Sequence, residues 1–231
     1  MTALARTVSP VFHFAAWLFG AACPQVVCAR EPAGEQRTAQ VSNTVRFNGE
    51  AASRDTIRVT EWVVASRDNG NRPFLIVDKV NARVYLFDHR AKLLGTAVAL
   101  LGLGRGDESV PGIGQRKLST ITPKERTTPA GRFVASLGND FTQDILWVDY
   151  DLALSLHRVI PGNAKDRRHQ RLASATALDN RISYGCINVP VGFYDKVIIP
   201  AFTGTTGTVY ILPETRTIEE VFAMTVPHPS R

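Results

Sequence analysis

One cysteine and one histidine are the residues of this sequence best suited to nucleophilic chemistry. Cys186 lies in the small, polar segment Ser183-Tyr-Gly-Cys-Ile-Asn188, and His157 ends the apolar segment Leu154-Ser-Leu-His157. A thiol attacks carbonyl groups as its thiolate, which a neighbouring base or cation favours near neutral pH. We therefore expect Cys186 to be a nucleophile and His157, held at a strand end, to be its base. The alternative is that Cys186 is a buried structural cysteine.

The other histidines outside the N-terminal block are expected to face solvent. His89 lies in a predicted turn, His228 in a proline-flanked segment and His169 in an arginine-rich loop. From Arg158 to Arg181, ends included, six Lys and Arg residues stand against two Asp residues. This positive segment could favour the thiolate and bind substrate carboxylates, for example through Arg181, or it could be a solvated charged loop.

Other kinds of site find little support in the sequence. Gly102-Leu-Gly104 lacks the further glycine of a dinucleotide-binding motif, and no cysteines or histidines stand in pairs at metal-ligand spacing. The chain has 27 Lys and Arg against 21 Asp and Glu, without the concentrated basic stripe of a nucleic-acid-binding protein. We therefore expect no metal, no organic cofactor and no nucleic acid partner.

The first 29 residues have the composition of a secretory signal peptide. Arg6 is their only charge, an apolar stretch covers residues 11–22, and Ala29 is a small residue at a possible cleavage point. We predict export to the periplasm with cleavage after Ala29, and no stable membrane insertion afterwards. A membrane anchor or a lipoprotein signal at Cys23 are the alternatives. Cleavage would also remove Cys28 and leave Cys186 as the single cysteine.

A linker and a helix are predicted between the signal peptide and the main domain, over residues 30–73. Residues 30–52 are polar and lack apolar periodicity, which is typical of a tether. The pattern over residues 55–66 predicts a helix with Ser53 or Asp55 as its N-cap. Its predicted apolar face consists of Ile57, Trp62, Val63 and Ala65.

Strand patterns dominate the remaining sequence and predict a mainly β fold with a few short helices. Alternating or continuous apolar residues predict strands over residues 74–78, 83–87, 93–101, 132–136, 145–150, 153–159 and 208–212. A long loop rich in glycine and proline separates two groups of strands over residues 102–129. Pro190 is expected to begin a helix over residues 190–201. Residues 215–231 are assigned to a C-terminal tail.

The segments around the two reactive residues resemble the YkuD-type L,D-transpeptidase family. Its signature is a strand-end histidine, followed later by Ser/Thr-His-Gly-Cys, an apolar residue and Asn or Arg; Ser183, Gly185, Cys186, Ile187 and Asn188 match it. Thr128-Pro-Ala-Gly-Arg-Phe133 resembles the family's entry to a core strand. The resemblance covers roughly residues 74–214 and implies a β-sandwich-like catalytic domain.

The resemblance also implies a reaction and a set of roles. Cys186 would attack the carbonyl that follows meso-diaminopimelate in a peptidoglycan stem tetrapeptide, D-Ala would leave, and a second stem peptide, an envelope protein or water would resolve the thioester. His157 would be the base, oriented by the carbonyl of Arg158. The amides of Tyr184, Gly185 and Cys186 would form the oxyanion hole. Substrate-binding roles would fall to Ser183, Asn188 and Arg181.

Two departures from the family pattern leave alternatives open. Tyr184 stands where the family has a second histidine, and residues 161–179 lengthen the interval between His157 and Cys186, so that they could form a lid. An L,D-carboxypeptidase or an amidase would differ from a transpeptidase only in the acceptor. A third possibility is a non-catalytic cell-wall-binding domain in which Tyr184 marks the loss of the site.

Overall fold

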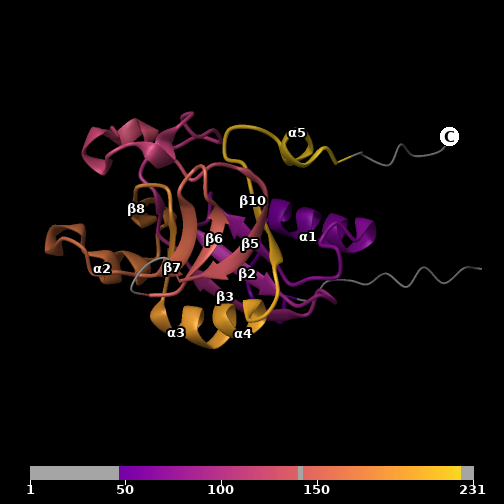
Figure 1. Cartoon of the computed structure of the whole chain (residues 1–231). Coiled ribbons are helices and arrows are strands. Elements are labelled where there is room, and N and C mark those ends of the chain that lie inside the picture. The colour runs from indigo at the N-terminus through magenta and orange to yellow at the C-terminus, as the bar shows by residue number, and fades with distance from the viewer. Residues whose placement is uncertain (1–46, 140–142, 225–231) are drawn as a thin grey trace, which may run out of the picture. The chain divides into compact units, whose positions relative to one another are not determined.

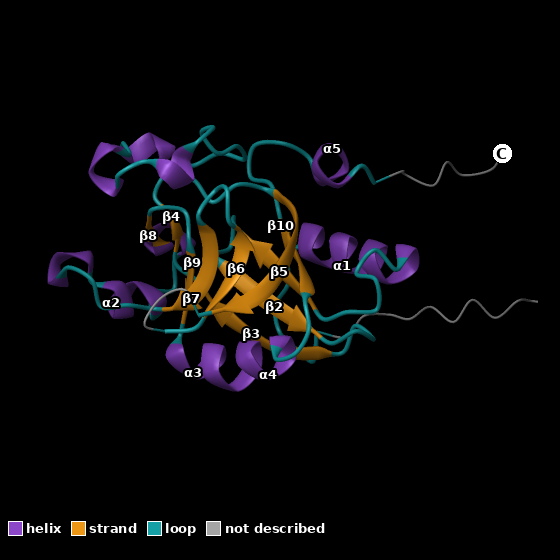
Figure 2. Ribbon diagram, viewed as in Figure 1, coloured by secondary structure: helices purple, strands orange, loops and turns teal. Residues whose placement is uncertain are grey.

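The structure is a computed structural model that describes residues 47–139 and 143–224 (Figure 1). These residues form mainly strands, with short helices between them (Figure 2). The described residues contain an eight-stranded sheet with the strand order β3-β2-β1-β10-β5-β6-β7-β9. The mainly β fold predicted from the sequence is therefore confirmed.

Two antiparallel meanders make up most of this sheet. The first consists of β1 (Phe74–Asp78), β2 (Arg83–Phe87) and β3 (Leu93–Val98). The second consists of β5 (Gly131–Gly138), β6 (Ile145–Asp149) and β7 (Leu154–Arg158). β10 (Gly207–Ile211) joins the meanders by pairing with β1 and β5, and β9 (Ile187–Val189) adds to β7 in parallel. A separate parallel pair joins β4 (Leu101–Gly102) to β8 (Arg181–Ser183).

One hydrophobic core lies inside a curl of the sheet. Leu75 and Val84, from the first strands of the order, belong to the same buried cluster as Leu156 and Ile187 from its last strands. A flat sheet could not bring its two ends to one core, so the sheet must bend round on itself. Backbone hydrogen bonds of 2.8 and 2.9 Å between Leu100, which follows β3, and Asn188 of β9 almost close the curl. The outcome is the predicted sandwich-like arrangement.

The helix α1 (Arg54–Ser66) covers the opposite face of the first meander. It packs with Phe74 and Ile76 of β1. These two residues alternate along the strand with Leu75 and Val77, which face the core inside the curl. The Ser53 side chain accepts a hydrogen bond from the Thr56 N–H at 3.1 Å, which makes Ser53 the N-cap, one of the two residues predicted for it.

The predicted apolar face of α1 was wrong in part. Ile57 is 37% exposed and Ala65 is exposed too, whereas Val63 is buried and Trp62 is half-buried, as a core-facing position requires. The rest of the buried face consists of Thr56, Val59 and Thr60. Two of these residues are polar because their hydroxyls find partners inside: Thr56 donates to Asp78 at 3.1 Å, and Thr60 donates to the Thr56 carbonyl at 2.6 Å. A buried hydroxyl with a partner costs little, so threonine can stand where an apolar pattern was expected.

A continuous helical segment follows β9, as Pro190 predicted. It comprises α3 (Val191–Phe193), a π-helical stretch η6 (Tyr194–Ile198) and α4 (Ile199–Phe202), with Pro190 as N-cap. Figure 1 shows this segment below the sheet, and its side chains belong to the core inside the curl, whereas α1 packs against the other cluster.

Two predicted coil segments contain more structure than the sequence indicated. The loop 102–129 contains three 3-10 turns, which are η1 (Ile113–Gln115), η2 (Leu118–Thr120) and η3 (Pro123–Glu125). The segment assigned to a C-terminal tail contains α5 (Ile218–Phe222), whose Ile218 and Phe222 are 2% and 7% exposed. Ile218 and Phe222 therefore belong to the buried cluster against which α1 packs. The sequence pattern did not predict this helix because it has only five residues.

Several sequence predictions fall on residues outside the described ranges. They are the signal peptide over residues 1–29, the cleavage point at Ala29, most of the linker, Cys23, Cys28 and His228. Within residues 47–139 and 143–224, no helix is long and apolar enough to cross a membrane.

Candidate active site

Strand pairing brings the predicted nucleophile and base together. β7 and β9 run parallel, with His157 paired to Asn188 and Leu156 paired to Ile187. Side chains alternate between the two faces of a strand, so the burial of Leu156 and Ile187 in the core turns the neighbouring residues to the other face. His157 and the residue before β9, Cys186, consequently lie on the same surface of the sheet.

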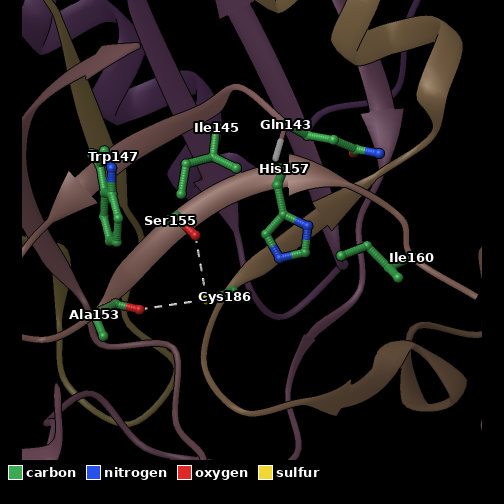
Figure 3. Close-up of a pocket in the computed structure, with 8 residues that line it drawn as sticks. All are labelled: Gln143, Ile145, Trp147, Ala153, Ser155, His157, Ile160 and Cys186. Atoms are coloured by element: carbon green, nitrogen blue, oxygen red, sulfur yellow. Dashed lines mark hydrogen bonds between the residues drawn. The ribbon is translucent and has the colours of Figure 1, made fainter. Parts of the chain in front are cut away.

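The Cys186 thiol lies in a half-buried position between three groups (Figure 3). Its sulfur is 3.5 Å from the Ser155 hydroxyl and 3.5 Å from the Ala153 carbonyl. The imidazole of His157 lines the same hollow beside the thiol. Ser155 precedes His157 by two residues on β7, so the same alternation that directs His157 also directs Ser155 toward the thiol.

The backbone of the next residue fixes the His157 ring. His157 Nδ1 lies 2.7 Å from the carbonyl oxygen of Arg158. A carbonyl can only accept a hydrogen bond, so Nδ1 carries the proton and the lone pair of the neutral ring is on Nε2. This tautomer puts the lone pair on Nε2, the nitrogen that would take a proton from the Cys186 thiol and that lies 3.4 Å from the Asn188 side-chain nitrogen.

The pKa values of the two groups move in opposite directions. Burial raises the pKa of the Cys186 thiol, but hydrogen bonding to His157, the charge of His157 and a hydrogen bond from Ser155 lower it more, to below its ordinary value. Burial likewise lowers the pKa of His157, yet the interaction with Cys186 and the Arg158 carbonyl raise it above its ordinary value overall. Both shifts therefore act in the direction of a thiolate and an imidazolium.

The turn before Cys186 requires glycine. Gly185 has φ +136°, and a Cβ atom at this position would lie 2.8 Å from the backbone oxygen of Thr127. Any side chain would therefore meet both backbone strain and a clash. The Ser183 hydroxyl fixes the same turn, because it accepts the Gly185 N–H at 3.1 Å and donates to the Cys186 carbonyl at 2.6 Å.

These hydrogen bonds decide which amides could hold an oxyanion. The Gly185 N–H is already engaged with Ser183, so it is not a free donor, which speaks against its predicted role. Among the described residues, the N–H groups of Tyr184 and Cys186 have no acceptor. Ser183 is 3% exposed and binds the turn itself, so the structure places it as a support of this turn rather than on the surface of the pocket.

Asn188 connects the base to the inserted segment 161–179. Its side-chain nitrogen lies 3.4 Å from His157 Nε2 and 3.3 Å from the Cys186 carbonyl, and its side-chain oxygen accepts a hydrogen bond of 2.9 Å from Arg168. Arg168 begins α2 (Arg168–Leu172), which lies between the short turns η4 (Ala164–Asp166) and η5 (Ala177–Asn180). The insertion therefore contacts the site through Asn188, which lies beside both His157 and Cys186.

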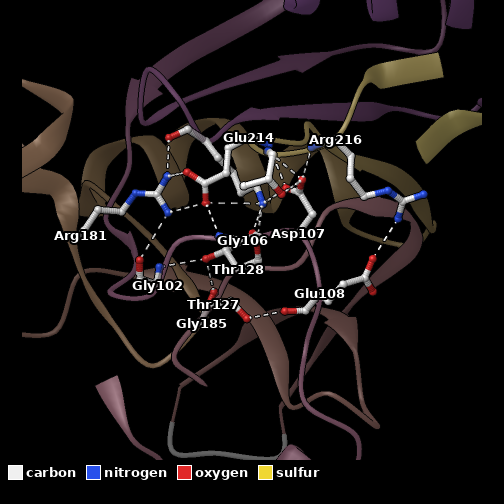
Figure 4. A network of polar contacts seen from close by, with 12 residues as sticks. Gly102, Gly106, Asp107, Glu108, Thr127, Thr128, Arg181, Gly185, Glu214 and Arg216 are labelled. Carbon is white, nitrogen blue, oxygen red and sulfur yellow. Dashed lines mark hydrogen bonds and ion pairs between the residues drawn. The ribbon is translucent and has the colours of Figure 1, made fainter. Parts of the chain in front are cut away.

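Two predicted arginines have their side chains elsewhere. Arg181 is 8% exposed, its guanidinium pairs with Glu214 at 2.6 Å (Figure 4), and it lines neither hollow at Cys186. The Arg158 side chain pairs with Asp144 at 3.0 Å and with Asp195 at 2.7 Å, so only its carbonyl reaches the site. His89 and His169 are exposed, in agreement with the sequence prediction.

Two hollows meet at Cys186. The larger has a volume of about 480 Å³ and mostly apolar walls. Its lining residues are Gln143, Ile145, Trp147, Ala153, Ser155, His157, Ile160 and Cys186 (Figure 3). The smaller has a volume of about 100 Å³ and lies between the loop 109–129 and the turn that carries Tyr184 and Gly185. None of the residues that line either hollow comes from the insertion 161–179.

The part of the chain that the structure describes contains no candidate metal site. No group of three or more His, Cys, Asp or Glu side chains there is arranged to hold a metal ion.

The altered thiol pKa predicts an unusual pH dependence of Cys186 alkylation. Iodoacetamide reacts with the thiolate, so its rate falls as pH drops through the pKa of the thiol. An ordinary cysteine titrates at about 8.5, and we expect the midpoint for Cys186 to lie below this value. His157→Ala should move the midpoint upward, because it removes the cation that stabilises the thiolate. Equal midpoints for the two proteins would show that His157 does not activate Cys186.

Tyr184 is expected to act without its hydroxyl. Its ring lies under the Arg126 guanidinium, 3.9 Å from the ring centroid, and among the described residues its hydroxyl has no hydrogen-bond partner. Tyr184→Phe keeps the ring and should change acylation of Cys186 by less than about twofold, since the stacking remains. Tyr184→Pro would delete the N–H and should slow acylation by about 10²- to 10³-fold in a protein that still melts cooperatively. A large loss in Tyr184→Phe would instead assign the phenol a chemical role.

Sequence reasoning missed three contributors to this site. Ser155 could have been found, because it precedes His157 by two residues in a predicted strand. Thr128 belongs to the motif Thr128-Pro-Ala-Gly-Arg-Phe133, but nothing in the sequence indicated that its hydroxyl donates to the Gly185 carbonyl. Arg168 reaches Asn188 only through the fold of the insertion, and no local pattern predicts that contact.

Comparisons with known proteins give only distant likenesses. No family model matches the chain, and no curated protein matches it. Among solved structures, the helical cell shape determining protein Pgp2 from Campylobacter jejuni has a TM-score of 0.41 at 12% identity, over 68% of this chain and 56% of that chain. A mutant of the Enterococcus faecium L,D-transpeptidase has a TM-score of 0.34 at 16% identity, over 61% and 50%.

A third similar structure is a fused Zn-dependent amidase, peptidase and peptidoglycan-binding domain protein from Clostridium acetobutylicum. It has a TM-score of 0.33 at 18% identity, over 70% of this chain and 65% of that chain. The chain thus spans less than two thirds of the length of each of these three proteins. At such scores the likenesses decide nothing about the reaction, which must be inferred from the site.

Proposed function

We propose that this protein catalyses cysteine-dependent acyl transfer on peptidoglycan stem peptides, with Cys186 as nucleophile. The observation that carries the proposal is a half-buried Cys186 thiol that shares one hollow with His157, a histidine whose tautomer the Arg158 carbonyl fixes. Thiol, oriented base and free amides at one turn are the parts that acyl transfer through a thioester requires. A structural cysteine would need none of them.

The reaction divides into two steps with one proton carrier. The Cys186 thiolate attacks a peptide carbonyl, and the Cys186 and Tyr184 amides would face the oxygen as it becomes negative. The C–N bond then breaks, and the His157 imidazolium gives its proton to the leaving amine. In the second step an amine attacks the thioester, His157 takes its proton, and the thiolate leaves. Water in place of the amine would make the enzyme a carboxypeptidase.

The substrate class rests on the sequence motifs, supported by the shape and chemistry of the site. The motifs around Cys186 and Thr128 resemble those of L,D-transpeptidases, whose substrates are stem tetrapeptides. The mostly apolar hollow of about 480 Å³ beside His157 has room for the acyl residue and the methylene groups of its side chain. We also propose export to the cell envelope, where this substrate occurs, on the basis of the N-terminal composition.

Product analysis with a defined substrate tests this proposal. Purified protein is incubated with disaccharide-tetrapeptide, with and without a D-amino acid or a second stem peptide as acceptor, and the products are identified by mass. A transpeptidase forms the exchanged or cross-linked product, and release of D-Ala alone indicates a carboxypeptidase. Cys186→Ala is the control for both. Binding of the tetrapeptide with no turnover would contradict an enzymatic function and support a wall-binding domain.

A further inference from the structure

Thr128 connects the loop 102–129 to the turn that carries the nucleophile. Its side chain is fully buried, and its hydroxyl accepts a hydrogen bond from the Gly102 N–H at 2.9 Å. Because the hydroxyl accepts there, its own hydrogen is free to be donated, and it is donated to the Gly185 carbonyl at 2.7 Å (Figure 4). Thr128 thus holds the carbonyl half of the peptide group between Gly185 and Cys186.

The other half of that peptide group is the Cys186 N–H. In a trans peptide the carbonyl and the N–H lie in one plane and point in opposite directions. A hydrogen bond that fixes the Gly185 carbonyl therefore also fixes the direction of the Cys186 N–H, which has no acceptor among the described residues. Gly185 makes this control necessary, because glycine leaves the flanking peptide planes freer to rotate than any other residue.

A buried ion cluster holds Thr128 in place from the other side. The Lys79 ammonium donates to the Thr128 carbonyl at 2.9 Å, to the Gly106 carbonyl at 2.7 Å and to Asp107 at 2.8 Å. Asp107 in turn accepts the N–H groups of residues 214–216, each at 2.8 Å. Thr128 is therefore fixed at both its main chain and its hydroxyl.

We propose that Thr128 is a positioning residue for acyl transfer, whose hydroxyl holds the Gly185–Cys186 peptide so that the Cys186 N–H faces the developing oxyanion. The proposal rests on the proposed function, since it assigns a task in the same reaction. It gives Thr128 no contact with substrate and no role in activating the thiol.

This division of roles has a measurable consequence. Alkylation of Cys186 by iodoacetamide is a displacement at carbon that needs the thiolate but forms no oxyanion. Acyl transfer needs both the thiolate and an oriented amide. Loss of the Thr128 hydroxyl should therefore impair one reaction of Cys186 and leave the other intact, whereas general loosening of the site would impair both.

The test compares variants at one position with two reactions. Thr128→Val keeps the shape and removes the hydroxyl, Thr128→Ser keeps the hydroxyl, and Thr205→Val removes an exposed hydroxyl as the matched control. The acyl donor is the stem tetrapeptide, with a small activated ester of acetate in parallel, because an ester needs the oxyanion site but no peptide recognition. We expect Thr128→Val to lower the rate with both acyl donors by about 10²-fold, the size of effect that follows loss of one oxyanion donor.

The same variant should alkylate at the wild-type rate and with the wild-type pH midpoint, while Thr128→Ser and Thr205→Val should keep acyl transfer. Equal losses in both reactions, no loss in either, or failure of serine to restore the rate would overturn the proposal. If Thr128→Val does not fold, Thr128→Ala against Thr128→Ser gives the same comparison. A wild-type protein that turns over the ester but not the tetrapeptide would contradict the proposed substrate alone. Alkylation without any ester turnover would contradict the oxyanion site, and the proposal with it.

Discussion

His157→Ala should slow acylation of Cys186 by about 10²- to 10⁴-fold, the range for loss of a general base. In the proposed reaction the histidine stabilises the thiolate and later protonates the leaving amine, and its fixed tautomer serves both tasks. His89 and His169, the other histidines in the described part of the chain, line neither of the hollows that meet at Cys186. The effect should exceed that of the Tyr184 and Thr128 side-chain variants, because it removes the proton carrier itself.

The measurement for His157 is a single-turnover acylation rate with a thermal melt of each variant. His169→Ala is the matched control, because His169 is exposed on the insertion and should leave the rate within about twofold. An acylation rate in His157→Ala close to that of the wild type would mean that another group takes the proton. Loss of the cooperative melt would assign His157 to the fold instead.

Lys79→Met should destabilise the protein by about 3–5 kcal/mol, which is typical for removal of one partner from a buried ion pair. The Lys79 and Asp107 side chains are 0% and 1% exposed, and their charged atoms are 2.8 Å apart. Burial lowers the pKa of Lys79 more than its carboxylate partners raise it, so the charged amine is held at a cost. Without the amine, the Asp107 carboxylate would remain buried beside Glu214.

Chemical denaturation of wild type and variant measures this loss of stability. Lys124→Met is the matched control, since Lys124 is exposed on η3, and it should change the free energy of unfolding by less than about 0.5 kcal/mol. A change below about 1 kcal/mol for Lys79→Met would show that the cluster is dispensable for stability.

Much of the fold follows from local sequence patterns. Alternation of apolar residues over 83–87 and the apolar run 74–78 predict the first hairpin, and the observed strands β1 and β2 have the same bounds. Pro190 likewise predicts the start of the helical segment after β9, because proline suits a helix N-terminus. Such features depend on a few neighbouring residues, so sequence alone can reveal them.

The parts that sequence did not reveal depend on contacts between distant segments. Thr56 and Thr60 replace apolar residues on the buried face of α1 because Asp78 and a backbone carbonyl satisfy their hydroxyls. Arg181 was assigned to substrate because arginine binds carboxylates, yet the fold brings Glu214 against it. The Gly185 N–H was counted as an oxyanion donor, but the Ser183 side chain turns back to accept it.

Intact-mass measurement after incubation with a carbapenem tests the role of Cys186 most directly. The strained ring amide opens on nucleophilic attack, and its two halves stay joined, so the acyl group remains on the enzyme. The resemblance to L,D-transpeptidases also implies that such compounds acylate the nucleophile. We predict a mass increase of one compound equivalent, located on the peptide that contains Cys186, and no increase for Cys186→Ala. An unmodified Cys186 in a folded sample, beside a control enzyme that is acylated, would contradict the assignment of Cys186 as the nucleophile.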